Sequence, residues 1–199
     1  MSTEARDHGA TLLPIARASI STALGRTLKA AEDAPWLQEL GASFVTLTRQ
    51  GQLRGCIGTL EARRSLLADV KANAIAAALR DPRFAPLAVT ELARTEIEVS
   101  MLSPMQPMQF EDEAHALAQL QPGIDGVVFE YERFRSTFLP QVWEQLPSPQ
   151  EFIAHLKHKA GLRPDFWAKG VRLQRYTVSK WKESEAQPRA HGAHKHGGS

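Results

Sequence analysis

One short segment constrains this 199-residue chain more than any other. It reads Leu53-Arg54-Gly55-Cys56-Ile57-Gly58-Thr59 and holds the only cysteine of the chain between two glycines. The β-rich run 44–48 and a Gln50-Gly51-Gln52 turn precede it, which predicts that residues 53–60 form the return strand of a hairpin. The fold is therefore expected to contain an antiparallel sheet with Cys56 inside one strand.

Side chains alternate between the two faces of a strand. The alternation predicts two sets of neighbours, with Arg54, Cys56 and Gly58 on one face and Leu53, Gly55 and Ile57 on the other. A guanidinium beside a thiol favours the thiolate, and Gly58 would leave room for a close approach. These features predict a functional thiol; the alternative is that Cys56 is a small buried side chain that only packs.

The composition, with 43% hydrophobic and 23% charged residues, is that of an ordinary globular protein. A lone cysteine excludes an intramolecular disulfide and any cysteine-based zinc cluster. Residues 1–8 lack the pattern of a signal peptide, and no apolar run reaches membrane-spanning length. We therefore expect a cytoplasmic protein with no membrane partner.

Apolar spacing predicts an amphipathic helix over 11–29 after a loose lead-in. A second, alanine-rich helix is expected to begin at Ser65 and to stop at Asp81-Pro82. A capping box at Ser148 begins a later helix that Gly161 ends. Alternating or β-rich runs predict further strands at 95–102, 126–131, 134–138 and 171–181.

Strands that come in hairpins, with helices between them, indicate an α+β fold with a largely antiparallel sheet flanked by helices. We expect one domain over residues 11–182. The remainder, 183–199, contains His191, His194 and His196 and has no apolar periodicity, so we expect it to be disordered.

The C-terminal part of this domain is basic. Residues 152–182 carry eight Lys/Arg against the single acidic Asp165, a net charge of +7, which suggests an anionic partner. Aromatic residues are interleaved with these charges, as in nucleic-acid binders, at Phe152, Phe166, Trp167, Tyr176 and Trp181. Most of them fall where they would close a core, so nucleic-acid binding is the weaker interpretation.

The sequence contains no Gly-rich phosphate loop, nucleophile elbow or pair of catalytic carboxylates, and we predict no cofactor. His155 and His158 stand three residues apart on one expected helix. Without a carboxylate at matching spacing they are a weak metal signal, so we predict no metal site. A cysteine-protease dyad has little support, since His155 lies in a helix that the sequence does not place against the sheet.

Several segments together resemble the AMMECR domain, also called protein A of the AmmeMemoRadiSam systems. Their order and spacing match this family over residues 11–182. The segments are 53–59, Asn73 followed by Asp81-Pro82-Arg83-Phe84-Ala85-Pro86-Leu87, 96–104, Phe138-Leu139-Pro140-Gln141-Val142-Trp143, Glu151-Phe152, and Lys159-Ala160-Gly161-Leu162.

The resemblance implies an α+β fold with a smaller accessory lobe, and work beside a Memo-like protein and a radical SAM protein. It implies no particular reaction. Many relatives carry a second cysteine where this chain has Lys157 or His158. A mechanism that needs two thiols in one chain is therefore not expected here.

We expect a small anionic ligand or a partner protein to bind at a cleft around Arg54 and Cys56. Cys56 would be the nucleophile or acceptor and Arg54 its activator. Four further residues are candidate ligand contacts, each with a structural alternative: Asn73, Arg83, Gln141 and Lys159. The alternatives for the whole protein are a non-catalytic protein-interaction module and nucleic-acid binding through the basic C-terminal face.

Overall fold

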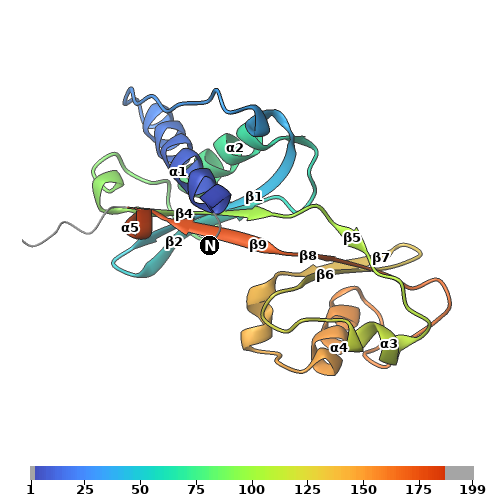
Figure 1. Ribbon diagram of the computed structural model, residues 1–199. Coiled ribbons are helices and arrows are strands. Elements are labelled where there is room, and N and C mark those ends of the chain that lie inside the picture. The colour runs from blue at the N-terminus through green and yellow to red at the C-terminus, as the bar shows by residue number, and fades with distance from the viewer. Residues whose placement is uncertain (1–2, 187–199) are drawn as a thin grey trace, which may run out of the picture.

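The computed structural model describes residues 3–186, which form two lobes connected by long strands (Figure 1). The larger lobe holds a five-stranded sheet of order β2-β1-β4-β9, with β3 pairing to β1. The smaller lobe holds a four-stranded sheet of order β5-β8-β6-β7. The strand pairs of both sheets are antiparallel, which confirms the predicted α+β fold.

The elements follow one another along the described chain with these bounds: α1 (Thr3–Ala23), η1 (Pro35–Gln38), β1 (Leu40–Arg49), β2 (Gln52–Gly58), β3 (Arg64–Ser65), α2 (Leu66–Leu79), η2 (Leu92–Arg94), β4 (Glu96–Leu102), β5 (Gln106–Pro107), α3 (Glu113–Ala118), β6 (Gly126–Tyr131), β7 (Phe134–Phe138), η3 (Pro140–Glu144), α4 (Pro149–Lys159), β8 (Arg172–Tyr176), β9 (Val178–Lys182) and α5 (Glu183–Ala186).

The predicted hairpin is present. β1 and β2 pair in antiparallel register, and Cys56 lies inside β2 opposite Thr46. Local signals also placed two helix starts correctly, because the Ser65 side chain accepts a hydrogen bond from the Ala68 N–H and Ser148 accepts one from Glu151. These side chains satisfy N–H groups that the first helical turn leaves unpaired.

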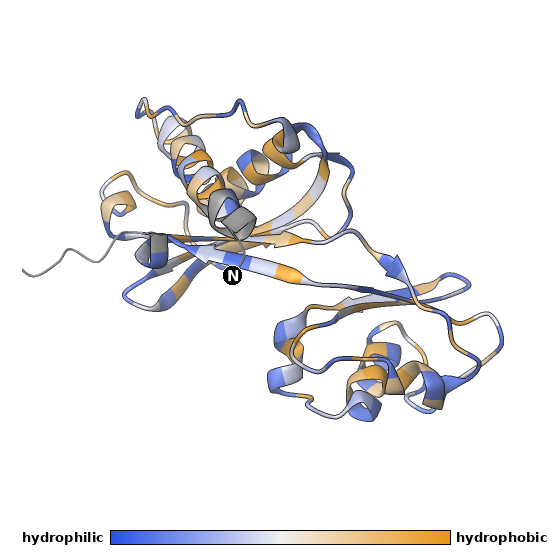
Figure 2. Ribbon diagram, in the orientation of Figure 1, coloured by the Kyte–Doolittle hydropathy of each residue, from blue (hydrophilic) through white to orange (hydrophobic). Residues whose placement is uncertain are grey.

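Helices α1 and α2 cover one face of the larger sheet, and their hydrophobic residues are visible in Figure 2. Fully buried side chains of α1, including Leu12, Ile15 and Ile20, pack in one core with Val45 and Leu47 of β1. The alanine-rich face of α2 allows a close approach to the sheet. That face, with Ala74, Ala77 and Ala78 buried, joins the same core.

The smaller lobe has its own core, in which the rings of Trp143 and Phe152 stack with centroids 3.8 Å apart. A third cluster of buried side chains lies between the lobes and contains Leu102, Val128 and Tyr176. The accessory lobe implied by the family resemblance is thus a packed unit with a helical layer formed by α3 and α4.

One predicted strand is in fact two. Residues 171–181 were expected to form a single strand, but β8 belongs to the smaller sheet and β9 to the larger one. At the change of sheet, Thr177 donates its N–H to the Ser103 hydroxyl and accepts from the Ser103 N–H through its carbonyl. The continuous chain 172–182 therefore connects the two lobes.

The ends of the domain also differ from the prediction. α1 begins at Thr3 and ends at Ala23, earlier than the expected 11–29, and Gly25 follows with φ 79°. A left-handed residue cannot continue a helix, and glycine adopts that conformation readily. At the other end α5 extends the fold past residue 182, while residues 187–199, with the three tail histidines, lie outside the described part of the chain.

Gly55 offers a test of the contact between α2 and β2. A Cβ at this position would lie 2.2 Å from the carbonyl oxygen of Ala77, a backbone atom that a rotamer change cannot move. We predict that Gly55→Ala lowers the free energy of unfolding by about 1–3 kcal/mol, the usual cost of overpacking. Urea unfolding measures it, with the exposed Gln52→Ala on the same strand as control, expected within about 0.5 kcal/mol of wild type. Equal stability of Gly55→Ala and wild type would contradict this packing.

Candidate functional site

Cys56 lines a cavity of about 600 Å³ on the face of the larger sheet that α1 and α2 leave uncovered. Neighbouring Gly55 points to α2, so alternation places the thiol on the opposite face. We call this cavity the Cys56 cleft. It is lined by Phe44, Thr46, Leu53, Cys56, Ile57, Asp81, Pro82, Arg83, Glu98, Ser100, Leu139, Pro140, Gln141, Val178 and Lys180.

Strand register assembles the floor of the cleft in two rows. In the first row Thr46 is the strand partner of both Cys56 and Glu98, and its hydroxyl donates to the Cys56 sulfur at 3.3 Å. In the second row Ser100 of β4 is the strand partner of Lys180 of β9. Directly opposed residues share a face and have Cβ atoms about 4.5–5.5 Å apart. Ser100 and Lys180 therefore present their side chains to the same part of the cleft.

The loop after α2 forms one wall of the cleft along the outer edge of β2. The Asp81 carboxylate accepts the N–H of Cys56 at 2.9 Å, and Arg83 donates to the carbonyl oxygen of Cys56 at 3.3 Å. Arg83 also binds the Asp81 carboxylate through Nε and Nη2. Hydrogen bonds from Arg83, and then those from the Cys56 and Arg83 backbone, hold the pKa of Asp81 well below its ordinary value despite its burial.

Arg54 does not occupy the predicted position beside the thiol. The register of β1 and β2 shifts between Leu47 and Thr48, so that Arg54 is an extra residue with no strand partner. Its guanidinium binds Glu91 and the carbonyl oxygens of Ala85 and Pro86, and Arg54 does not line the cleft. The same bulge brings Leu53 to the Cys56 face, against the predicted alternation.

Arg83 is the guanidinium that lies by Cys56 instead. It lines the cleft and interacts electrostatically with the thiol as well as with Asp81. Arg54 acts at one remove, because its contacts hold the 85–91 segment against the edge of β2. The structure thus separates the two arginines into one that lines the cleft and one that holds the segment beyond it.

The smaller lobe contributes the opposite wall. Gln141 lies in η3 with Leu139 and Pro140 close by, and all three line the Cys56 cleft. The Gln141 amide has no hydrogen-bond partner among the described residues. The structure therefore brings together Cys56, Arg83 and Gln141, three of the six predicted site residues, although they are far apart in the sequence.

Asn73 has the structural role that was the alternative prediction. Its amide donates to the Ser43 carbonyl at 2.9 Å and to the Asp69 carboxylate at 2.9 Å, in a buried cluster beneath α2. Asp69 is 1% exposed and also accepts hydrogen bonds from Ser43, Thr59 and Arg64. The cluster ties α2 to β1, and Asn73 does not line the cleft.

Lys159 also lies away from the cleft. Its ammonium group donates to the Thr137 carbonyl at 2.9 Å and sits 5.0 Å from the centroid of the Phe138 ring. These contacts attach the end of α4 to β7. Gly58, which was expected to clear space for an approaching group, instead makes room for the Phe44 ring, because a Cβ there would lie 2.2 Å from that ring.

Sequence reasoning missed five polar residues of the cleft: Thr46, Asp81, Glu98, Ser100 and Lys180. Because side chains alternate along a strand, the predicted strand at 95–102 implies that Glu98 and Ser100 share one face, as observed. What the sequence lacked was the strand that pairs with β4. Only the pairing of β4 with β9, about eighty residues later, brings Lys180 opposite Ser100.

Two acidic and two basic side chains line the cleft, and not all of them have a partner. Asp81 pairs with Arg83, and Glu98 lies 3.4 Å from Lys182. Lys180 has no hydrogen-bond or ion-pair partner among residues 3–186. Ser100 is 5% exposed and its hydroxyl is likewise without a partner in the described chain. One ammonium and one nearly buried hydroxyl thus remain available on the floor of the cleft.

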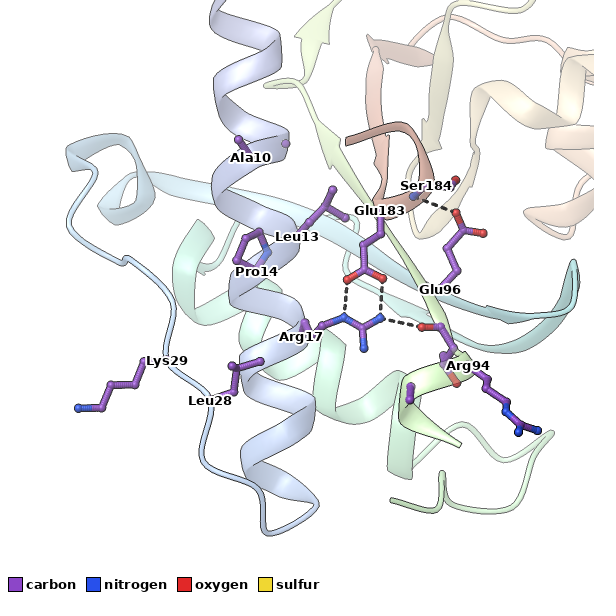
Figure 3. Close-up of a pocket in the computed structure, with 13 residues that line it drawn as sticks. Ala10, Leu13, Pro14, Arg17, Leu28, Lys29, Arg94, Glu96, Glu183 and Ser184 are labelled. Carbon is purple, nitrogen blue, oxygen red and sulfur yellow. Dashed lines mark hydrogen bonds and ion pairs between the residues drawn. The ribbon is translucent and has the colours of Figure 1, made fainter. Parts of the chain in front are cut away.

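A second cavity, of about 860 Å³, lies between α1, α5 and the start of β4 (Figure 3). Arg17 crosses it and binds the Glu183 carboxylate and the carbonyl oxygens of Leu92 and Thr95. Glu183 also accepts the N–H of Ile97 at 2.9 Å. The hydrogen-bonding groups in this cavity bind one another, and these contacts attach α5 to the domain. It also explains why the fold continues beyond residue 182.

The interleaved aromatic residues of the basic segment are mostly internal. Phe152, Tyr176 and Trp181 are at least nine-tenths buried, and Phe166 and Trp167 pack against the core of the smaller lobe. No group of three or more His, Cys, Asp or Glu side chains that could hold a metal occurs in the described part of the chain. Nor is any of its helices long and apolar enough to cross a membrane.

Comparison with known proteins covers both lobes. The family model AMMECR1 matches residues 13–181. A protein of Methanothermobacter thermautotrophicus is 37% identical over 188 residues, covering 89% of this chain and 95% of that protein. Protein MJ0810 of Methanocaldococcus jannaschii is 37% identical over 140 residues, covering 67% of this chain and 68% of that protein. The crystal structure of the uncharacterized protein PH0010 from Pyrococcus horikoshii aligns with a TM-score of 0.73 at 31% identity, covering 89% of this chain and 92% of that one.

The free energy of unfolding should depend on pH through Glu91, which binds Arg54 beyond the wall of the cleft. Hydrogen bonds from Arg54 and from the Ala88 N–H lower the pKa of Glu91 from 4.5 to about 2. Folding depresses this pKa, so the stabilisation is complete above the unfolded value and is lost as the pH falls towards about 2. We predict that Glu91→Gln lowers the free energy of unfolding by about 1 kcal/mol at pH 7, because the lost ion pair is partly exposed and screened by solvent. In urea unfolding the difference from wild type should shrink below pH 4.5, and a difference independent of pH would contradict the assignment.

Asn73 should matter for stability and not for the cleft. Asn73→Ala removes a buried amide that binds Ser43 and Asp69, and we predict a loss of about 2–3 kcal/mol, since buried partners are left unsatisfied. The rate at which iodoacetamide alkylates Cys56 in the folded variant should be unchanged. Unchanged stability with altered alkylation would instead place Asn73 in the site.

Proposed function

The chain belongs to the AMMECR1 family, and from this premise we propose that it binds a small organic anion in the Cys56 cleft. The observation that carries the proposal is the Lys180 ammonium, which lies opposite the Ser100 hydroxyl and has no partner among residues 3–186. A cation and a hydroxyl group that share one face of a sheet can together bind a carboxylate or a phosphate. The cavity volume of about 600 Å³ is within the range of small-molecule sites.

The cleft combines polar groups with apolar surface, which is the usual composition of a ligand site. Phe44, Leu139 and Pro140 provide apolar surface for the body of the ligand. Ser100, Gln141 and Lys180 provide the directional contacts. The anion is held at the β4–β9 end of the cleft and the ligand extends from there towards Cys56.

Cys56 is the group that would react with the ligand or accept a group from it. The thiol lies at the opposite end of the floor from Lys180, three inter-strand steps of about 4.8 Å across the sheet and one row, or two residues, along the strands. Thr46 donates a hydrogen bond to the sulfur, and the Arg83 guanidinium lies by it. The thiolate is the nucleophilic form of a cysteine. Arg54 has a positioning role through Glu91 and the 85–91 segment.

The family resemblance supports a wider proposal, that the protein works in the cytoplasm beside a Memo-like protein and a radical SAM protein. A non-catalytic interaction module is the alternative, since the same cleft can bind a partner without any reaction at Cys56. Nucleic-acid binding is less well supported, because the aromatic side chains that would stack on bases are inside the two lobes.

A thiol reagent that carries its own anion tests the proposal. 6-Maleimidohexanoic acid can react with Cys56, the only cysteine, while its carboxylate reaches towards Lys180. Relative to free glutathione, we predict that the acid labels Cys56 about fivefold faster than its neutral methyl ester does, as about 1 kcal/mol of charge attraction requires.

Lys180→Gln should abolish this preference for the acid. Lys169→Gln removes the same charge from a residue that does not line the cleft, and it should leave the preference intact. Labelling is followed by intact-mass measurement. An acid-to-ester ratio equal to that of glutathione, or a ratio that Lys180→Gln leaves unchanged, would overturn the proposed anion site.

A further inference from the structure

A third cavity adjoins the Cys56 cleft and extends it beyond the sheet. It has a volume of about 480 Å³ and shares four lining residues with the cleft, Pro140, Gln141, Val178 and Lys180. Its far end is formed by Pro122, Gly123 and Ile124, with Trp143 and Pro147 alongside. We call it the Ile124 groove. The two cavities therefore meet at Gln141 and Lys180, and a ligand in one has a path into the other.

The Ile124 groove has an apolar end that the small-anion proposal does not use. Ile124 is a large hydrophobic residue, yet 52% of it is exposed. A single exposed isoleucine is ordinary, but this one lines the same cavity as Lys180, whose ammonium group has no partner among the described residues. An occupant of the groove would therefore combine an anion at Lys180 with an apolar group at Ile124.

The junction of the two cavities carries the hydrogen-bonding groups of an amide. Gln141 offers one carbonyl acceptor and an NH₂ donor, and neither has a partner among the described residues. A side-chain amide of this kind can pair reciprocally with a peptide group. Ser100, nearly buried and without a partner in the same part of the chain, adds a hydroxyl next to Lys180.

The groove also follows an unpaired strand edge. In the described part of the chain, β9 is an edge strand of the larger sheet and pairs with β4 alone. The Thr177 N–H and carbonyl point to Ser103, on the β4 side. Because backbone groups alternate along a strand, those of Val178 and Lys180 point to the outer edge of β9, and both residues also line the Ile124 groove. Exposed strand edges of this kind bind extended polypeptides.

We propose that the ligand of this site is the carboxyl-terminal end of a polypeptide. This inference rests on the small-anion site proposed above and names the class of molecule that carries the anion. The terminal carboxylate binds Lys180 and Ser100, and the last peptide group pairs with Gln141. The preceding residues lie along the Ile124 groove, and the side chain of the final residue points into the Cys56 cleft. Four extended residues span about 13 Å, enough to occupy both cavities.

Protection of Cys56 tests this inference without a known partner sequence. The probes are two pools of N-acetylated tetrapeptides of randomised sequence, one with a free carboxylate and one amidated at the C-terminus. Neutral iodoacetamide reports the accessibility of Cys56 by intact mass. The free-acid pool should protect Cys56 at a concentration about tenfold lower than the amidated pool, the value of one charged hydrogen bond.

Ile124→Ser is the matched variant, because Ile124 lines the groove and not the Cys56 cleft. It should weaken protection by the free-acid pool about fivefold through lost apolar contact, while leaving the Lys180-dependent maleimide preference unchanged. Equal protection by both pools, no protection by either, or protection that Ile124→Ser leaves unchanged would overturn the inference. If the Lys180-dependent maleimide preference persists in any of these cases, the small-anion site stands and only its peptide ligand fails.

Discussion

The geometry of the site depends on the hydrogen bonds by which Asp81 and Arg83 bind the outer edge of β2. A free strand edge exposes unpaired N–H and carbonyl groups, and native sheets cover or block such edges. Here the Asp81 carboxylate accepts a hydrogen bond from the Cys56 N–H, and the Arg83 guanidinium donates one to the Cys56 carbonyl. Side chains of a loop thus occupy the place of a further strand. The same contacts close one wall of the cleft and place a guanidinium by the thiol. Loss of these hydrogen bonds would expose the edge of β2 and remove one wall of the cleft.

The two lobes make the site jointly. The larger sheet supplies the thiol, the hydroxyl of Ser100 and the ammonium of Lys180, and the smaller lobe supplies Gln141 and the apolar wall. The continuous chain of β8 and β9 fixes their relation, because it belongs to one sheet before Thr177 and to the other after it. Leu102, Val128 and Tyr176 pack at this joint. The distance between Gln141 and the sheet is thus set by interior packing, which favours a site formed before the ligand arrives.

Local signals in the sequence predicted the parts of the fold that local chemistry decides. The glycine-flanked hairpin and the serine caps at Ser65 and Ser148 are interactions between near neighbours, so the residue pattern shows them. The bulge at Arg54 and the change of sheet at Thr177 depend on segments distant in sequence, and no local pattern records them. For the same reason Cys56 was identified from its motif, whereas Lys180 entered the site only through strand register. Asn73 and Lys159 looked like ligand contacts because a polar side chain carries no sign of which group will bind it.

The central claim is that Ser100 and Lys180 hold an anion on the same floor that carries Cys56. A crystal structure of the protein labelled at Cys56 with 6-maleimidohexanoic acid tests it most directly, since the reagent carries a carboxylate on a chain of suitable length. The claim predicts carboxylate oxygens within about 3 Å of Lys180 Nζ and of Ser100 Oγ. A carboxylate that points into solvent, with Lys180 and Ser100 still without partners, would contradict it.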